Sequence, residues 1–154
     1  MRTKKNLNLI PLIIDKLNGK NILTLAAIYQ TSPMILLTTN LSIKRPQDLY
    51  NRNIMLTSDA RTSVAISSMI TSKGISLNDI NFQEHSFNLD DLISGKTDAM
   101  GSYISNEPFI LKNKNIKYNI LDPKDYGFDF YGGILFTSKF EVDKHTQRVQ
   151  NFQK

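Results

Sequence analysis

The amino-acid sequence predicts an α/β fold with a mainly parallel sheet. Short aliphatic runs, typical of strands buried on both faces, alternate along the chain with segments of helical periodicity. Glycine, proline and asparagine separate these segments at short spacing, and such alternation favours parallel strands joined by helical crossovers. The chain has 154 residues, of which 40% are hydrophobic, so it is long enough for one globular domain with a substantial core.

The first two predicted strands are the aliphatic runs at residues 22–28 and 34–39, both expected to be buried on two faces. The polar segment 30–33 separates them. Pro46 suits the first position of a short helix, since proline has no N–H to satisfy there. A further strand is predicted at residues 54–57.

A helix of about four turns is predicted over residues 60–73. Ser58 or Asp59 can cap its start, and Gly74 can end it in the left-handed conformation. A short strand follows at residues 80–82. This order of strand, helix and strand is the repeating unit of a parallel sheet.

The next predicted helix spans residues 89–93, with Asn88 as its cap and Gly95 as its end. A strand at residues 98–104 then runs directly into a helix at residues 108–113. We predict two more strands, at residues 118–121 and 132–137, and a helix from residue 142 to the end of the sequence.

The amino-terminal segment, residues 1–15, has a basic start and an apolar stretch, as secretory signals do. Asn8 interrupts this stretch, Asp15 closes it, and no small-x-small cleavage pattern follows. A buried helix or strand is therefore the preferred interpretation. No apolar run approaches the ~20 residues of a membrane span, so we expect no membrane span in this chain.

The composition argues against several function classes. The net charge of +5 comes from lysines and arginines that stand singly or in pairs, without the basic stripe and interleaved aromatics of nucleic-acid binding. The absence of cysteine excludes disulfides, thiolate metal sites and cysteine nucleophiles. His85 and His145 lie in no metal-binding or nucleophile motif. We therefore predict no catalytic residue, no metal and no cofactor.

The segment YISNEPF, residues 103–109, concentrates hydrogen-bonding groups where a strand ends and a helix begins. In open α/β sheets ligands bind at such junctions, so Tyr103, Asn106 and Glu107 are candidate ligand-binding residues. A plain helix start is the alternative, because Ser105 or Asn106 can cap a helix and Pro108 needs no hydrogen-bond partner there.

Three other segments are candidates for the same site. Gln30, Thr31 and Ser32 follow a predicted strand and can present an amide and hydroxyls, although an ordinary turn explains them equally well. Asp129 and Tyr131 belong to an aromatic segment that suits a planar ligand or the packing of a hinge. The segment 58–63, SDARTS, can bind an anion at a helix start, although helix capping alone explains its first two residues.

Four segments of the chain resemble a family of binding proteins: SIKRPQDLYNRNIML, SKGISLNDINF, DDLISGKTDAMGSYISNEPFILKNKNIKYNILDPKDYGFDFYG and LFTSKFEVDKHTQRVQNF. They resemble, in this order, the type II periplasmic solute-binding proteins for alkanesulfonates and thiamine-pyrimidine precursors. The resemblance is closest to versions of the domain fused to bacterial sensor kinases or cyclases. It begins near Leu17, and YISNEP and DYGFDFYGG are its most specific parts.

The resemblance implies a two-lobed fold that closes on a ligand in a cleft between the lobes. It assigns residues 1–45 and 123–154 to the first lobe and residues 46–122 to the second, with hinge strands near residues 38–44 and 126–132. The strand, helix and strand with which such domains begin have no counterpart here, so the first lobe is expected to be incomplete. The glycine that usually precedes the strand at residue 54 is replaced here by Asn51, Arg52 and Asn53. Asparagine can still adopt the left-handed conformation.

The resemblance further implies a non-catalytic function. It predicts binding of a small polar or heteroaromatic molecule, such as an aminopyrimidine, for uptake through an ABC permease or for sensing by a fused kinase or cyclase. The implied location is periplasmic or otherwise outside the cytoplasm. The alternative is an enzyme of the same fold that forms a pyrimidine precursor. The chemistry of such enzymes uses a histidine and a cysteine-rich motif, and this chain has no cysteine.

Overall fold

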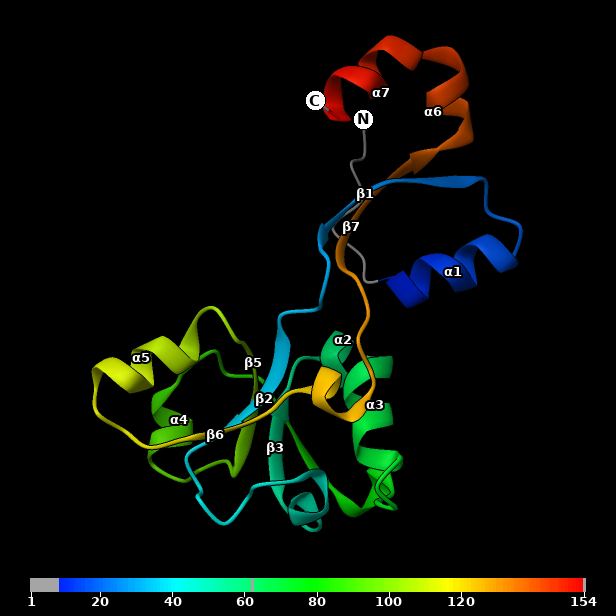
Figure 1. Ribbon diagram of the computed structural model, residues 1–154. Coiled ribbons are helices and arrows are strands. Elements are labelled where there is room, and N and C mark those ends of the chain that lie inside the picture. Colours follow the sequence, from blue (N-terminus) through cyan, green and yellow to red (C-terminus); the bar gives the residue numbers. More distant parts are fainter. Residues whose placement is uncertain (1–8, 62, 154) are drawn as a thin grey trace. The chain divides into compact units, whose positions relative to one another are not determined.

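The computed structural model describes residues 9–61 and 63–153, and the chain forms two compact units (Figure 1). The second unit is the continuous segment Pro33–Asp129, and the first combines Met1–Ser32 with Phe130–Lys154. Residues 33–45 and 123–129, which the sequence analysis assigns to the first lobe, lie in the second unit. The chain passes between the units at residues 32–33, outside the expected hinge at 38–44, and at residues 129–130, inside the expected hinge at 126–132.

The second unit contains a five-stranded sheet with the strand order β4-β3-β5-β2-β6. Its strands are β2 (Met34–Thr38), β3 (Asn53–Leu56), β4 (Asn81–Glu84), β5 (Ala99–Tyr103) and β6 (Asn119–Leu121). Each overlaps a strand predicted from its aliphatic run, because such runs bury a side chain on both faces of a central sheet.

Four of the five strands run in the same direction, as the prediction of a mainly parallel sheet requires, and β2 alone is reversed. β3 pairs in parallel with β4 and β5, but β2 pairs antiparallel with both β5 and β6. Met34, the first residue of β2, lies opposite Tyr103, the last residue of β5, so β2 begins at the edge where β5 ends. A continuous aliphatic run looks the same for either strand direction, and for this reason the sequence pattern could not show the reversal.

Helices cover both faces of the sheet, which gives a three-layer arrangement (Figure 1). Successive residues of β2 point to opposite faces. Leu36 belongs to a core with Ile66, Met69 and Ile70, which α3 contributes, whereas its neighbours Ile35 and Leu37 belong to a second core with Leu92 of α4 and Leu111 of α5. The helices are α2 (Ser58–Arg61), α3 (Val64–Thr71), α4 (Asp90–Ile93) and α5 (Glu107–Asn113), with 3-10 turns at Pro46–Leu49, Leu77–Asp79 and Pro123–Tyr126.

The four-turn helix predicted at residues 60–73 is divided into α2 and α3. The Thr57 hydroxyl accepts a hydrogen bond from the Ala60 N–H at 3.4 Å, so Thr57 caps the first turn in place of Ser58 or Asp59. Ser63 starts the second piece in an extended conformation, which interrupts the helical phase. Gly74 ends α3 with a φ of 82°, as predicted, because glycine adopts this region without a steric penalty.

Over its described residues, 9–32 and 130–153, the first unit contains a two-stranded antiparallel sheet and three helices. β1 pairs with β7 from Ile22 opposite Ser138 to Tyr29 opposite Gly132, and the register shifts between Thr24 and Ala26, which leaves Leu25 as a bulge. Its elements are α1 (Leu9–Leu17), β1 (Ile22–Tyr29), β7 (Gly132–Ser138), α6 (Lys139–Lys144) and α7 (Thr146–Gln153). His145 separates α6 from α7, so the helix predicted from residue 142 is also divided.

Unlike the predicted buried strand, β1 is largely exposed. The side chains of Leu23 and Ile28 are 37% and 56% exposed, and only three of the eight positions of β1 are half-buried. In α1, Leu12 is buried and Leu17 is 80% exposed. The prediction of a buried element at the amino terminus therefore holds for one face of α1, and residues 1–8 lie outside the described part of the chain.

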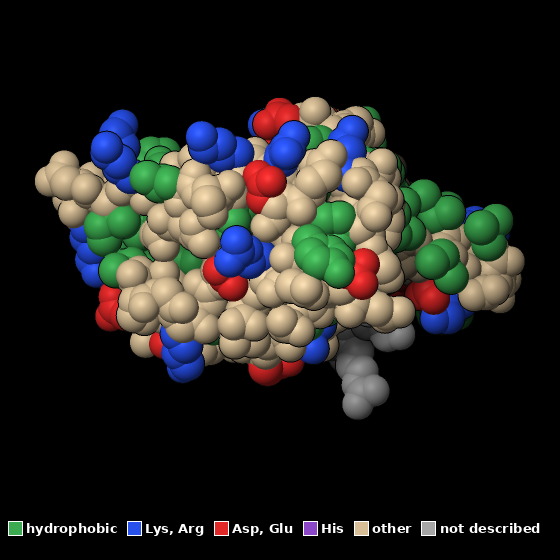
Figure 2. Space-filling view, turned by 90° about the horizontal axis from the view of Figure 1, so that it is seen from below, with side chains coloured by type: hydrophobic (Ala, Val, Ile, Leu, Met, Phe, Trp, Pro, Cys, Tyr) green, Lys and Arg blue, Asp and Glu red, His purple; other side chains and the backbone are tan. Residues whose placement is uncertain are grey.

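Charged side chains of both signs are interspersed on the surface of the protein. Figure 2 shows one face on which Lys and Arg alternate with Asp and Glu, separated by uncharged residues. Several of the basic residues in the second unit form ion pairs, including Arg45 with Asp48 and Lys96 with Asp91. Among the described helices, none combines the length and the hydrophobicity that a membrane crossing requires.

Candidate functional site

A cavity opens at the edge of the second unit's sheet where three parallel strands end. β3, β4 and β5 run in the same direction, so the residues that follow them meet at one edge. β2 runs the other way and begins at this edge. The helix α2 follows β3, and α5 follows β5, so both helices also start there.

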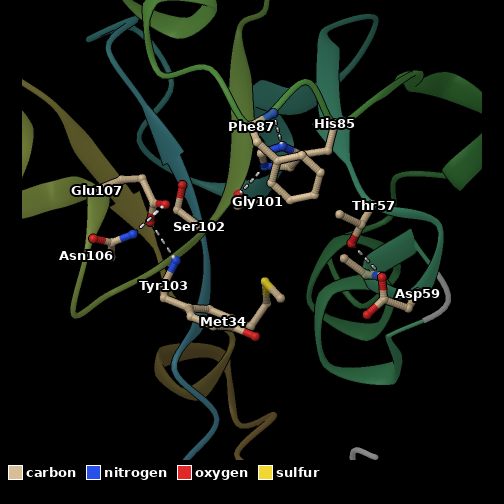
Figure 3. Close-up of a pocket in the computed structure, with 11 residues that line it drawn as sticks. Met34, Thr57, Asp59, His85, Phe87, Gly101, Ser102, Tyr103, Asn106 and Glu107 are labelled. Carbon is tan, nitrogen blue, oxygen red and sulfur yellow. Dashed lines mark hydrogen bonds between the residues drawn. The ribbon is translucent and has the colours of Figure 1, made fainter. Parts of the chain in front are cut away.

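The cavity has a volume of about 320 Å³, which is large enough for a small organic molecule (Figure 3). Every lining residue belongs to the second unit. They are Met34, Thr57, Asp59, Ala60, His85, Phe87, Gly101, Ser102, Tyr103, Asn106 and Glu107.

Glu107 organises the turn between β5 and α5. Its carboxylate accepts hydrogen bonds from the Tyr103 N–H at 3.1 Å and from the Asn106 side-chain amide at 3.0 Å (Figure 3). The Asn106 N–H donates to the Tyr103 carbonyl at 2.9 Å. Asn106 occupies the N-cap position of α5, but its side chain makes no capping hydrogen bond, so the predicted cap is wrong at this residue. Glu107 holds the turn closed and also adds a negative charge to the cavity wall.

Ser102 provides an unused hydrogen-bonding group at the cavity. The residue is only 4% exposed, and its Oγ has no hydrogen-bond partner in the described part of the chain. Leaving a buried hydroxyl unsatisfied costs about 1–3 kcal/mol, so such groups usually serve a ligand or an ordered water. A Cβ on the preceding Gly101 would lie 2.6 Å from Leu56 Cδ2, so a side chain there would require the buried Leu56 side chain to shift.

His85 and Phe87 form a fixed aromatic pair at the cavity. His85 Nδ1 accepts the Phe87 N–H at 2.9 Å, so its Nε2 carries the proton and donates to the Gly101 carbonyl at 2.8 Å. The two rings are 4.6 Å apart. Phe87 adopts a φ of 59°, which is unusual for a bulky residue, and its side chain is 80% exposed. His85 thus holds a strained aromatic residue at the cavity (Figure 3).

Ser86 and Asp91 hold the segment that carries this pair. The Ser86 hydroxyl donates to Asp91 Oδ2 at 2.7 Å and accepts the Asn88 N–H at 3.2 Å. The hydrogen bond from Ser86, with help from Lys96, lowers the pKa of Asp91 below its ordinary value of 3.8. Asp91 is therefore a carboxylate at neutral pH, and it joins the start of α4 to the segment that follows β4.

The structure brings together some of the residues predicted from sequence and leaves others apart. Tyr103, Asn106 and Glu107 all line the cavity. Asp129 belongs to the same unit but does not line it. Gln30, Thr31, Ser32 and Tyr131 belong to the first unit, where the Ser32 N–H donates to the Phe130 carbonyl at 2.8 Å and the Gln30 side chain approaches the Ala27 carbonyl at 3.5 Å.

The predicted anion site at residues 58–63 does not coincide with the cavity. Arg61 pairs with Glu84 at 3.2 Å and is not a lining residue, whereas Asp59 of the same segment contributes a carboxylate to the wall. Thr62 lies outside the described residues. Within the described ranges 9–61 and 63–153, no group of three or more acidic or histidine side chains could hold a metal ion.

Sequence reasoning missed Thr57, Phe87 and Ser102 as cavity residues, placed Asp59 in a segment suited to an anion, and found His85 in no metal-binding or nucleophile motif. A signal for four of these five was present, since Thr57 and Asp59 follow β3, His85 follows β4, and Ser102 lies near the end of β5. Nothing in the sequence indicates the positive φ of Phe87, because glycine, asparagine and aspartate are the residues expected there.

Comparisons with solved structures identify the fold. The chain is similar to two SsuA proteins, one from Methylobacillus flagellatus KT, named as the periplasmic sulfonate-binding protein of an ABC transporter, and the aliphatic sulphonate binding protein from Escherichia coli. The respective TM-scores are 0.71 and 0.68 and the identities 19% and 14%. A substrate-binding protein of an ABC uptake transporter from Streptococcus pneumoniae, with bound histidine, matches with a TM-score of 0.59 and 16% identity.

These alignments cover 96%, 96% and 90% of this chain but only 45%, 51% and 55% of the respective solved chains. The chain therefore spans about half the length of the proteins it resembles. At identities below 20% the likeness establishes the fold, which is that of the periplasmic binding proteins. The comparison with curated proteins finds no match.

A family profile described as NMT1/THI5 like matches residues 8–154, which is nearly the whole chain. This match and the periplasmic-binding-protein fold agree with the family resemblance seen in the sequence. The chain belongs to the NMT1/THI5-like family.

Proposed function

We propose that this chain is a non-catalytic solute-binding domain whose second unit binds a small polar or heteroaromatic molecule. The observation that carries the proposal is the buried Ser102 hydroxyl, which lacks a partner in the described chain and belongs to a residue lining a cavity of about 320 Å³. A ligand that hydrogen-bonds to Ser102 would recover the free energy lost by leaving this hydroxyl unsatisfied.

The proposed role is delivery of the solute to an ABC permease or reporting of its presence to a fused sensor kinase or cyclase, outside the cytoplasm. The names of the structural relatives support such a role, since they describe components of ABC transporters that bind sulfonates or carry histidine. An aminopyrimidine is the ligand that the sequence resemblance favours. Sulfonates and amino acids enter the same test, because relatives of the same fold bind them.

A thermal-shift screen of solutes tests the proposal. At about 100 times its dissociation constant, a ligand specific for the folded state stabilises a protein by roughly 2.7 kcal/mol, which is readily seen as a rise in Tm. The library should contain aminopyrimidines, amino acids and alkanesulfonates. Ser102→Ala should reduce the shift caused by a true ligand. Ser105→Ala is the matched control, since Ser105 lies in the same turn but is exposed and does not line the cavity. A library without any Ser102-dependent ligand would contradict the proposal.

The family resemblance implies that the enzymatic alternative, formation of a pyrimidine precursor, uses a histidine in its chemistry. His85 is the only histidine among the lining residues, and both of its ring nitrogens already form hydrogen bonds with the backbone. Incubation with pyridoxal phosphate, followed by mass spectrometry of the small molecules and of the protein, distinguishes the two functions. Appearance of a new product would contradict the non-catalytic proposal.

A further inference from the structure

The cavity wall of the second unit carries negative charge. Asp59 of α2 and Glu107 of α5 both line it, and Figure 3 shows them on opposite sides of the cavity. No lysine or arginine occurs among the described lining residues. His85 adds no positive charge in the hydrogen-bonded form described above, because its Nδ1 accepts the Phe87 N–H. An anion would therefore enter a field of the same sign as its own.

The hydrogen-bond donors that could hold an anion are largely used within the chain. Backbone N–H groups at the ends of strands and the starts of helices are the usual anion ligands. Around this cavity, the N–H of Phe87 donates to His85, that of Tyr103 to Glu107, that of Asn106 to the Tyr103 carbonyl and that of Ala60 to Thr57. The acceptor groups of the lining residues include two carboxylates, of which that of Glu107 already accepts two hydrogen bonds within the chain, and the Ser102 hydroxyl.

Aromatic faces complete the wall. Phe87 and Tyr103 are 80% and 49% exposed, and both line the cavity. Phe87 keeps this position despite its strained backbone, because His85 accepts its N–H and packs against its ring. The face of an aromatic ring carries partial negative charge and attracts cations within about 6 Å of the ring centre.

We propose that this cavity selects organic cations, such as protonated amines, amidines or guanidines, and rejects sulfonates and other anions. Asp59 and Glu107 supply the charge, Phe87 and Tyr103 supply the faces on which the organic body packs, and Ser102 accepts a hydrogen bond from the cationic group. The inference rests on the proposed solute-binding function and specifies the ligand's charge. It separates this chain from the relatives named for sulfonate binding, although they share its fold.

Three planar compounds of nearly the same shape test the charge directly: benzamidinium, benzamide and benzoate carry charges of +1, 0 and −1 at neutral pH. Isothermal titration calorimetry with the whole chain should show benzamidinium binding about tenfold or more tightly than benzamide, and benzoate binding most weakly. Added sodium chloride should weaken the binding of benzamidinium and leave that of benzamide nearly unchanged, since salt screens only the charged ligand.

Two variants assign the effect to the cavity. Asp59→Asn and Glu107→Gln each remove one negative charge at nearly constant size, and each should lower the affinity for benzamidinium several-fold without lowering that for benzamide. Asp125→Asn is the matched control. Asp125 is an exposed carboxylate of the same unit outside the cavity lining, so its loss should change neither affinity.

The outcomes separate this inference from the proposed function. Equal binding of the three compounds, a preference for benzoate, or no binding by any of them would overturn cation selectivity. None of these results would contradict solute binding itself, which fails only if the broader screen yields no ligand that depends on Ser102. Tight binding of benzamidinium that Asp125→Asn weakens as much as Asp59→Asn would also overturn the inference, because the charge effect would then not belong to the cavity.

Discussion

Phe87 combines an exposed aromatic ring with a strained backbone, two features that bring the fold little stability. Its ring is mostly exposed, so it gains little from hydrophobic burial, and its φ of 59° costs about 1–2 kcal/mol for a residue with a side chain. The hydrogen bond from its N–H to His85 and the contact with the His85 ring offset part of this cost. Strain of this kind is typical of binding sites, where the position of a side chain matters more than stability.

Substitution of Phe87 should therefore separate stability from binding. Phe87→Gly removes both the ring and the strain, whereas Phe87→Ala removes the ring and retains the strained Cβ. We expect Phe87→Gly to be more stable than Phe87→Ala by about 1 kcal/mol in urea unfolding, because only glycine adopts a positive φ without penalty. Both variants should lose affinity for benzamidinium to a similar extent. A more stable alanine variant would show that Phe87 is not strained.

At the residue scale, the sequence pointed to those residues of the cavity wall that have a local signature. Tyr103, Asn106 and Glu107 stand together before Pro108, where a strand passes into a helix, and that junction is visible in the sequence. His85 and Phe87 reach the same cavity through the pairing of β4 with β3, which depends on contacts between distant parts of the chain. Their place in the cavity could not be predicted from neighbouring residues alone.

At the element scale, aliphatic runs and glycines located the strands and several helix ends, but they did not show that β2 is reversed. Gly74 and Gly95 adopt positive φ at the predicted ends of α3 and α4, because a local steric rule decides those positions. The reversal of β2 depends on which strands it pairs with, and the extended Ser63 between α2 and α3 lies in a segment, residues 58–64, that has no glycine or proline to mark a break. Neither the reversal of β2 nor the break between α2 and α3 changes the hydrophobic periodicity of the sequence.

The segment between β4 and α4 should lose its anchor in acid. The hydrogen bond from Ser86 and the nearby Lys96 lower the pKa of Asp91 in the folded protein. A lowered pKa means that Asp91 stabilises the fold above its unfolded value of 3.8, and that this contribution disappears as the pH falls through the folded value.

Urea unfolding of the wild type between about pH 5 and pH 2, followed by circular dichroism, measures the loss. Asp91→Asn should be less stable than the wild type at neutral pH and should lose less stability on acidification, and Ser86→Ala should change in the same direction. Identical acid responses in the wild type and Asp91→Asn would show that Asp91 does not anchor the segment.

At the scale of the whole molecule, the two units differ in how well they bury their apolar residues. The sheet of the second unit has a core on each face, whereas the first unit exposes apolar side chains on α1, β1, α6 and α7. The exposed residues of these elements are Ile13, Ile14, Leu17, Leu23, Ile28, Tyr29, Phe140 and Phe152. Apolar surface of this kind favours association, and the strand edges of a two-stranded sheet can pair with another chain.

We therefore expect the chain to self-associate through its first unit at micromolar concentrations, in sedimentation velocity or light scattering. Ile28→Thr should weaken association, because threonine keeps the β-branched shape and removes apolar surface from an exposed strand position. Phe109→Ser is the control, since Phe109 is 59% exposed but lies in the second unit. A wild type that stays monomeric at all concentrations, or equal effects of the two substitutions, would contradict this assignment.

The first unit is formed by two segments that are far apart in the sequence, and this determines the order in which the two units can fold during synthesis. β1 leaves the ribosome early but must wait for its partner β7, since Ile22 pairs with Ser138. The second unit is continuous and can fold in that interval. Its folding places β2 beside β6, with Leu36 opposite Leu121, and this shortens the loop that β1 and β7 still have to close. The cavity of the second unit can thus form on the nascent chain while β1, which was synthesised before it, is still unpaired.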